Sequence, residues 1–470
     1  MKTRTLIITM IIALGLTIPA FSQITLDNMN LTSSGARARA MAGAFSSIAD
    51  DGTALFWNPA GLIQVLDPQI SFAVDYYHPK STHNITYADN PSRNLADPLT
   101  KNKTPLSLAV FTAPIRIKNH QFVASVGYSV VSNRLSEEIA RVGVVDIDSA
   151  FVYQDIYDCR LNKLMLGFGT NIVNNLNFGA GINIYVGEGV NNFYLNYIDH
   201  FEDAYQHVPV DYIYKGAIAD TISYSGLNFT TGFHWDGEKL GLGLVVNTPF
   251  WLTQKHVMHI ADTVWINGLI NTDPASINEL PKERIEMPWG VTLGASYNVS
   301  DNFLLSSDFE WRRYGVSNIR IHFDTVYSNG DVQENYYEGS LATENGLQVK
   351  VGAEYLLEAG FATIPVRVGY RYETFGWLDF QDADYTVGEA DEDNPDADTL
   401  IIMNNYGDQI TGHTIAFGFG LHWKLIQLDF AVELFNRDFR IDGIDAYGPF
   451  ESAIENRSSR LTMNFTGLFK

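Results

Sequence analysis

Residues 35 to 62 read GARARAMAGAFSSIADDGTALFWNPAGL, and this segment differs in kind from the chain that follows it. Small side chains crowd its first half, and they permit close packing of the backbone inside another structure. Pro59 lacks an N–H group and disfavours the α conformation at Asn58, so we expect any helix over Ala54 to Trp57 to end there in a sharp turn. Taken alone, the segment fits a compact plug and a helix-turn packed on a soluble core equally well.

The first 22 residues have the layout of a secretory signal peptide. Lys2 and Arg4 supply positive charge, the run 6–18 is almost continuously apolar, and Ala20-Phe21-Ser22 is an acceptable cleavage site. The mature chain is therefore expected to begin at Gln23. A retained anchor is disfavoured because the apolar run is shorter than the roughly 20 residues that span a bilayer.

Charge and composition exclude several classes of function. The formal net charge is −23, and removal of the two signal-peptide cations makes it −25, which argues against a nucleic-acid partner. The single cysteine, Cys159, cannot form an internal disulfide, so packing or strand pairing must hold the exported chain together. Aromatic residues make up 13% of the chain and charged residues 18%, which fits the aromatic girdles of a membrane barrel and also a β-sandwich.

From Gln69 onward, apolar and polar residues alternate in segments of about ten residues, the pattern of a transmembrane β-barrel. The segment 460–469 is the clearest, with mainly apolar residues at odd positions and mainly polar residues at even ones. The same alternation predicts fourteen strands at 69–79, 105–116, 121–132, 158–174, 176–188, 221–235, 239–251, 284–298, 302–314, 346–357, 364–376, 410–423, 425–437 and 458–469.

The connections between these segments distinguish a barrel from a soluble sheet, which would show the same alternation. Brief connections alternate with long polar ones, and the brief ones lie at 118–120, 174–175, 236–238, 300–301, 358–363 and 424. Outer-membrane barrels have short periplasmic turns and longer extracellular loops. We therefore predict an all-β, antiparallel transmembrane barrel of about 14 strands, in the outer membrane with both termini in the periplasm. Its domains are a signal peptide (1–22), an N-terminal hatch that plugs the lumen (23–66) and the barrel (67–470).

The strand faces turned away from lipid carry charges of both signs. Interleaved signs on neighbouring strands indicate paired networks that close a lumen or fix a plug in it, and individually solvated charges are the equally weighted alternative. The residues are Asp308, Glu310, Arg312, Lys350, Glu354, Arg367, Arg371, Glu373, Asp429 and Glu433. The strand 176–188 presents small inward residues such as Gly179 and Gly181, which leaves room there for the hatch.

No catalytic, cofactor or metal motif stands out. His256 and His259 lie in a predicted long loop without a partner at metal spacing, and Gly241-Leu242-Gly243 lies inside an alternating strand, where glycine relieves crowding at a bend. The acidic loop Asp379–Asp408 could hold calcium, but it lacks EF-hand spacing, so a solvated loop is favoured. We expect no enzyme activity and no cofactor.

The segment 35–62 resembles the N-terminal hatch of the outer-membrane transporters of long-chain fatty acids and aromatic hydrocarbons, the FadL/OmpP1/TodX group. Two further blocks resemble strands of that group: MPWGVTLGASYNVSDNFLLSSDFEWRRY from Met287 and VKVGAEYLLEAGFATIPVRVGYRYE from Val349. The resemblance implies a fourteen-stranded barrel in which a hydrophobic ligand binds, the hatch shifts and the ligand leaves sideways into the membrane. It assigns the hatch to the motif residues Gly35, Arg37, Gly43, Asp50, Asp51, Asn58, Pro59, Ala60 and Gly61.

The loops depart from the group, because they are acidic and polar. Val257–Ile270 is apolar enough to form a capture helix for the ligand. The resemblance leaves two functions open, beside a third reading as a purely structural barrel. The first is uptake of hydrophobic compounds, with outer-membrane lipid and lipopolysaccharide as surroundings. The second is a protein-binding barrel that acts as a shuttle with type IX secretion-system proteins, as a sister branch of the same group does.

Overall fold

The computed structural model describes residues 35–78, 80–87, 95–100, 106–117, 120–143, 150–202, 209–267, 269–279, 281–326, 332–340, 344–387, 400–445 and 448–469. The predicted signal peptide, residues 23–34 and the acidic run 391–398 lie outside these ranges. No helix among the described residues is long and apolar enough to span a membrane.

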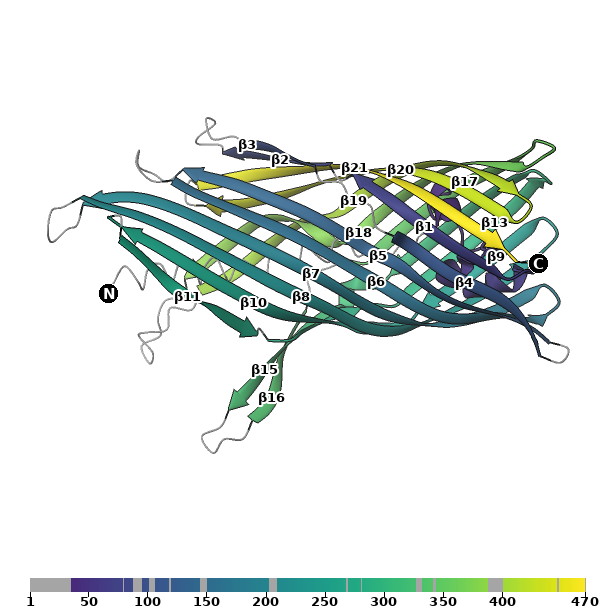
Figure 1. Cartoon of the computed structure of the whole chain (residues 1–470), viewed down its shortest axis with the longest axis horizontal. Coiled ribbons are helices and arrows are strands. Elements are labelled where there is room, and N and C mark those ends of the chain that lie inside the picture. Colours follow the sequence, from purple (N-terminus) through teal and green to yellow (C-terminus); the bar gives the residue numbers. More distant parts are fainter. Residues whose placement is uncertain are drawn as a thin grey trace.

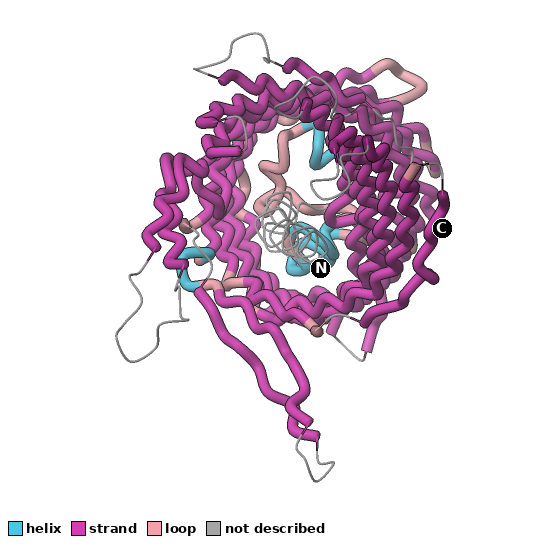
Figure 2. Tube along the Cα trace, turned by 90° about the vertical axis from the view of Figure 1, so that its left-hand side faces the viewer, coloured by secondary structure: helices cyan, strands magenta, loops and turns pink. Residues whose placement is uncertain are grey.

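Fourteen strands close into one antiparallel barrel (Figures 1 and 2). In order around the wall they are β1 (Gln69–His78), β4 (Leu106–Ile117), β5 (His120–Gly143), β6 (Ala150–Val173), β7 (Leu176–Glu202), β8 (Pro209–Asp236), β9 (Leu240–Asn247), β13 (Gly290–Ser300), β14 (Phe303–Arg312), β17 (Gly346–Glu358), β18 (Thr363–Val387), β19 (Leu400–Trp423), β20 (Ile426–Asp445) and β21 (Gly448–Leu468). Closure is made by β1 and β21, which pair from Gln69–Leu468 to His78–Ser459. The predicted barrel is confirmed.

Alternating side chains explain why these segments form a barrel wall. On β21, Leu461, Met463 and Phe465 are exposed on the outer surface, whereas Thr462 and Asn464 are buried inside. Large apolar side chains are likewise exposed along the outer faces of β6, β7, β18 and β19. An apolar exterior and a polar interior invert the usual arrangement of a soluble protein and suit a wall that faces lipid.

Seven further strands extend the wall or stand beside it: β2 (Lys80–Tyr87), β3 (Leu95–Thr100), β10 (Phe250–Ile266), β11 (Leu269–Glu279), β12 (Glu283–Met287), β15 (Asn318–Val326) and β16 (Val332–Ser340). Breaks at Thr248-Pro249 and Pro288-Trp289 separate β9 from β10 and β12 from β13, because proline cannot donate a hydrogen bond to the sheet. The β15–β16 hairpin projects away from the barrel (Figure 1). It is joined to β12 through Glu283–Ile285.

Several predicted boundaries are wrong at the end away from the short turns. The strands β5, β6, β7 and β8 continue well past the predicted ends, so much of what was expected to be polar loop is paired strand. Val257–Ile270 is not a helix, because its first part belongs to β10, which pairs with β8 from Thr253–Ser225 to Ile266–Tyr212. His256 and His259 therefore lie in a strand and not in a loop.

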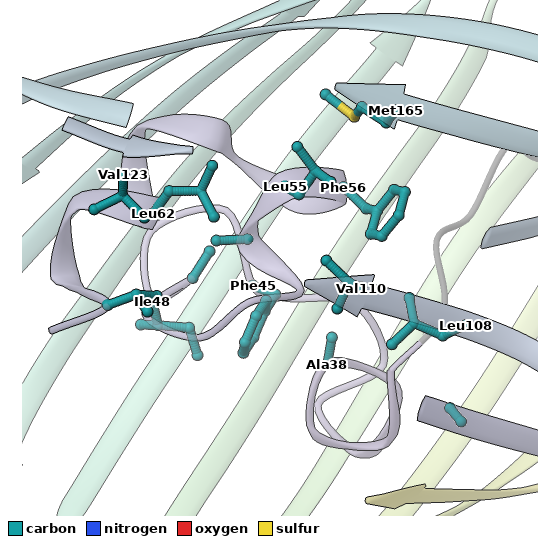
Figure 3. Packing of buried hydrophobic residues seen from close by; sticks show 14 of the residues in the cluster. Ala38, Phe45, Ile48, Leu55, Phe56, Leu62, Leu108, Val110, Val123 and Met165 are labelled. Atoms are coloured by element: carbon teal, nitrogen blue, oxygen red, sulfur yellow. The ribbon is translucent and has the colours of Figure 1, made fainter. Parts of the chain in front are cut away.

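Residues 35–66, which we call the lumenal segment, lie inside the barrel at the end that carries the short turns and the C-terminus (Figures 1 and 2). The segment contains two short α-helices, α2 (Ala36–Ala40) and α3 (Ala54–Trp57), and the 3₁₀-helix η1 (Pro59–Gln64). Helix α3 ends where Pro59 predicts, with Asn58 in an extended conformation. The turns of the segment place Leu55, Phe56 and Leu62 against Val110, Val123 and Met165 of the wall (Figure 3).

Candidate functional site

The lumenal segment touches the wall through backbone as well as side chains, because glycines face it from one strand after another. A Cβ atom added to Gly179 would lie 2.1 Å from the carbonyl carbon of Pro59, and one added to Gly369 would lie 2.3 Å from the carbonyl carbon of Met41. We call the residues that meet the segment in this way the glycine ring: Gly169, Gly179, Gly232, Gly243, Gly294, Gly352, Gly369 and Gly418. The glycine at 243 accommodates this contact and not the bend that the sequence suggested.

Asn58 is fully buried and holds the centre of the segment in place. Its side-chain oxygen accepts a hydrogen bond from the Ala60 amide at 3.1 Å, which caps η1. Its amide nitrogen donates to the Ser46 carbonyl at 2.7 Å and to the Phe233 carbonyl of β8 at 3.1 Å. One side chain therefore joins two turns of the lumenal segment to the wall, which explains the Asn-Pro-Ala pattern in physical terms.

The neighbouring motif residues serve the same compact turn. Pro59 and Ala60 pack on the glycine ring, and a Cβ atom at Gly61 would lie 1.8 Å from the Ala49 carbonyl oxygen. Gly35 and Gly43 have φ angles of 118° and 85°, a region that side chains rarely adopt.

Arg37 forms a bidentate ion pair between the segment and the wall. Its Nε and Nη2 atoms donate to the two carboxylate oxygens of Glu354 on β17, each at 3.0 Å, and its Nη1 atom donates to Asp50. Burial alone would lower the pKa of Arg37, but the carboxylates of Asp50, Glu354 and Asp51 raise it well above its ordinary value. Such bidentate pairs fix geometry as well as charge.

Burial raises the pKa of the Asp51 carboxyl, although Arg37 and hydrogen bonds from Thr53 act in the opposite direction. Its Oδ1 atom accepts from the Thr53 amide at 2.8 Å and from the Thr53 hydroxyl at 2.5 Å. The carboxyl therefore shapes the turn that leads into α3, and the buried negative charge itself carries a cost.

Arg39 joins the segment to the closing strands of the barrel. Its Nη1 atom donates to Asp75 of β1 at 2.6 Å and to the Thr462 hydroxyl of β21 at 2.8 Å. Asp75 also accepts from Ser107 of β4 at 2.8 Å. The arginine is buried and therefore holds the first and last strands together from inside the lumen.

Of the ten charged residues expected to face the lumen, all but Arg312 are buried, and the ten fall into connected groups. Arg367 donates to Glu354 at 2.5 Å and to Asp429 at 2.6 Å, so the Arg37 pair continues across the wall. Glu310 accepts from Lys350 at 2.5 Å and lies 2.5 Å from Arg312. Arg371 lies 3.2 Å from Glu373 and 3.7 Å from Glu433, and Asp308 accepts from the amides of Phe45 at 3.1 Å and Ser46 at 2.9 Å.

Beyond the lumenal segment, toward the long hairpins, inward side chains form a second apolar group that we call the upper cluster. It draws on β5, β6, β7, β8, β10 and β12, and Tyr185 stacks on Phe250 with ring centroids 4.6 Å apart. Its buried members are Val131, Cys159, Leu161, Tyr185, Ile222, Tyr224, Phe250, Leu252, Ile285 and Met287. These side chains are buried against one another inside the lumen, and an apolar ligand that packed among them would be favoured there over water.

Solved structures with the same architecture include a FadL homologue and two toluene transporters. The chain aligns with a Pseudomonas aeruginosa FadL homologue at a TM-score of 0.61 and 12% identity, over 93% of this chain and 99% of the homologue. The chain has the FadL-type fold. The toluene transporters TodX from P. putida (TM-score 0.56, 13% identity, 94% of this chain and 99% of TodX) and TbuX from Ralstonia pickettii (0.52, 13%, 94% and 100%) also share it. No protein-family model matches the sequence, and no curated protein matches it.

Within this FadL-type barrel, sequence reasoning missed several residues that bind the lumenal segment. Arg39 stands two positions after Arg37 in the same motif, and Asp75 occupies an inward position of the first predicted strand, so both could have been found. No feature of the sequence marks His234 as a contact of the segment. Its Nε2 atom lies 2.9 Å from the Ser47 carbonyl oxygen, and its Nδ1 atom lies 3.2 Å from the side-chain amide nitrogen of Gln64. The upper cluster combines residues from six strands and has no signal in any one of them.

The charged side chains described in the lumen of this FadL-type barrel form ion pairs with one another. Within the described ranges, no group of three or more His, Cys, Asp or Glu side chains is placed to hold a metal ion. His256 has a carboxylate partner that sequence spacing concealed, since its Nδ1 atom lies 2.7 Å from Asp220 of the adjacent strand β8. The lumen therefore offers apolar side chains of the upper cluster for binding, next to a lumenal segment that ion pairs hold in place.

Proposed function

We propose that the protein is an integral outer-membrane channel that takes up hydrophobic compounds, either long-chain fatty acids or aromatic hydrocarbons. The observation that carries this proposal is the upper cluster, an apolar surface inside the lumen of a FadL-type barrel. Two solved proteins of this fold are named toluene transporters, which supports the same class of ligand. An apolar compound crosses the polar lipopolysaccharide layer poorly and benefits from an enclosed apolar site.

The lumenal segment acts as the hatch of this channel, with Gly35, Arg37, Gly43, Asp50, Asp51, Asn58, Pro59, Ala60 and Gly61 as its fixed points. The short-turn end faces the periplasm, which puts both termini there and leaves the upper cluster on the extracellular side of the hatch. Ligand at the upper cluster is then separated from the periplasm by the hatch alone. Its ion pairs to the wall allow two discrete arrangements, docked and released, and uptake requires the released one.

Lateral release into the bilayer is supported by the pairing of β5. Its residues 120–129 pair with β4, but among the described residues 130–143 pair with β6 alone. The pairing with β6 shifts register between Val130 and Ser132, and Val131, which lies at this irregularity, belongs to the upper cluster. A ligand in that cluster is therefore beside a stretch of the wall in which β5 is paired on one side alone among the described residues.

Uptake of radiolabelled palmitate and toluene tests the proposal in cells that lack other channels for either compound. Expression of the protein should raise uptake of at least one of them. Leu252→Asn places a polar amide in the upper cluster and should lower that uptake several-fold. Leu269→Asn is the matched control, because Leu269 is 77% exposed on β11, and it should leave uptake unchanged.

The same cells distinguish the second function. If neither compound enters faster with the protein present, and the display of other proteins at the cell surface fails in its absence, the channel is excluded and the type IX secretion shuttle is supported. Uptake that is equal in the wild type and in Leu252→Asn would exclude the upper cluster as the binding surface.

A further inference from the structure

Three titratable side chains from three strands lie together beside the upper cluster, on its side away from the lumenal segment. His256 of β10 is the strand partner of Ile222 on β8, and Asp220 follows Ile222 on the same face. Glu283 begins β12 on the face that carries Ile285. The exposed fractions of the His256, Asp220 and Glu283 side chains are 11%, 16% and 25%. We call these three residues the histidine bridge.

The imidazole of His256 stands between the two carboxylates. Its Nδ1 atom lies 2.7 Å from Asp220, and its Nε2 atom lies 3.9 Å from Glu283. Strand β10 pairs with β8 along one edge and with β12 along the other, so the backbones of β8 and β12 are separated here. The side chain of His256 therefore connects two strands that do not pair with each other.

His256 attracts both carboxylates only as a cation. With both ring nitrogens protonated, one N–H group donates to Asp220 and the other directs positive charge at Glu283. A neutral ring that keeps its bond to Asp220 turns the lone pair of Nε2 toward Glu283 instead. The two carboxylates then repel each other in a partly buried site, with no cation between them.

The charged groups whose fields act on His256 are Asp220 and Glu283, and no cation shares their face. Lys282, which precedes Glu283, pairs with Glu334 at 3.4 Å. The other neighbours on this face have apolar, amide or phenol side chains: Asn191, Tyr224, Gln254, Met258, Ile285 and Ile321. Burial alone would lower the pKa of His256, but the hydrogen bond and charge of Asp220 and the charge of Glu283 raise it above its ordinary value.

We propose that the histidine bridge is a pH-sensitive switch, which holds β12 against β10 while His256 is protonated and releases it when the proton leaves. Strand β12 is five residues long, and beyond Gln254 the pairing of β10 passes from β12 to β11. Its pairing with β15 is confined to Glu283–Ile285. Release of its first residues therefore frees the base of the β15–β16 hairpin and uncovers Ile285, whichever ligand the upper cluster takes.

The direction of the pH dependence follows from the raised pKa of His256. The histidine bridge stabilises the paired β12 fully below the ordinary histidine pKa of about 6.5, and this stabilisation is lost as the pH rises through the raised value. On the outer face of β10 at this level Lys255 and His259 are exposed, so the switch lies beyond the apolar exterior of the wall. Mild acid therefore favours the closed arrangement and mild alkali the open one.

Hydrogen exchange measured by mass spectrometry tests the switch on the full-length protein in a non-ionic detergent, from about pH 5.5 to about pH 8.5, on either side of the histidine pKa. Exchange rates are corrected for the intrinsic pH dependence of amide exchange. Peptides that cover β12 and the start of β15 should lose protection by about fivefold to tenfold as the pH rises, as expected for up to one unit of pKa shift. Peptides of β18 and β19 should keep theirs.

His256→Gln replaces the imidazole by an amide that cannot become charged. In this variant β12 should be as weakly protected at the lowest pH as in the wild type at the highest, and the pH response should vanish. His259→Gln, at an exposed histidine of the same strand, is the matched control and should keep the wild-type response. His322 of β15 lies 3.1 Å from Glu334 and is a second histidine near β12. A response that is lost in His322→Gln and kept in His256→Gln overturns the proposal.

Glu283→Gln acts in the opposite direction and so guards against simple misfolding. It removes the repulsion between the carboxylates, and β12 should be about fivefold more protected than in the wild type at the highest pH. Heat-modifiable electrophoretic mobility shows whether each barrel is folded. If His256→Gln does not fold, Glu283→Gln decides, and a loss of protection equal to that of the wild type overturns the proposal. Exchange is measured without ligand, so a failure of uptake in the cells described above leaves this result unaffected.

Discussion

Replacing Asn58 by alanine should release the lumenal segment from the wall without unfolding the barrel. The substitution removes three hydrogen bonds, those with the Ala60 amide and with the carbonyls of Ser46 and Phe233. Only the bond to the Phe233 carbonyl crosses to the wall, so a typical net contribution of about 1 kcal/mol gives a loss of about 1 kcal/mol in docking free energy. The ratio of released to docked segment should therefore rise roughly fivefold.

Hydrogen exchange measured by mass spectrometry reads this ratio directly, since amides of residues 36–48 exchange when the segment leaves the wall. These amides should lose protection in Asn58→Ala by roughly the factor above, while peptides of β18 and β19 stay as in the wild type. The matched control is Asn171→Ala, because Asn171 also takes part in three hydrogen bonds, at 2.6, 3.4 and 2.8 Å, but at an exposed position beside a turn of the wall. It should leave the segment protected.

Protection within about twofold of the wild type in Asn58→Ala would refute the reasoning, because it would mean that the glycine ring and the ion pairs hold the segment without Asn58. A simultaneous loss of protection in β18 and β19 would refute it differently. The segment would then be part of the barrel's own stability and could not move alone.

Three further variants test the charges and the close packing, the first two by the same exchange measurement and the third by urea denaturation. Asp51→Asn removes a carboxyl whose pKa is raised by burial in the docked segment. Docking of the wild type therefore strengthens as the pH falls through that raised pKa. At pH 7.5 the segment should be more protected in the variant than in the wild type, and this difference should vanish on acidification. Gly369→Ala should deprotect the segment, since its Cβ would lie 2.3 Å from Met41, whereas Gly290→Ala, with its nearest neighbour at 3.7 Å, should not. Glu310→Gln leaves two buried cations without their shared carboxylate and should destabilise the barrel by about 3–5 kcal/mol, seen as a lower midpoint in urea.

Sequence reasoning succeeded where the two faces of a strand meet different surroundings. Between Arg460 and Phe469 one face meets the exterior and the other the lumen, so apolar and polar residues alternate strictly enough to be read. Beyond the apolar exterior this contrast fades, because apolar and polar residues are mixed on both faces of the long hairpins, as in 257–266. That is why β7 was expected to end at 188 and instead runs to Glu202, and why the strand at Val257–Ile266 resembled a helix.

The candidate site was predictable in part for a related reason. Arg37 and Asn58 belong to one continuous motif, and inward charges such as Glu354 follow from the strand period. Contacts across the lumen do not follow from either, because they depend on how far each strand is displaced along its neighbours. The grouping of Asp220, His256 and Glu283 and the assembly of the upper cluster are both of this kind.

Arg39 has a consequence for how the molecule is made. The strands that it joins, β1 and β21, are the first and last to be synthesised, and their pairing turns an open sheet into a barrel. The lumenal segment immediately precedes β1 in the chain, so its arginine is already beside that strand when β21 arrives. Filling the lumen and sealing its wall are therefore steps of one assembly reaction, and Arg39 is the residue through which the contents of the barrel take part in its closure.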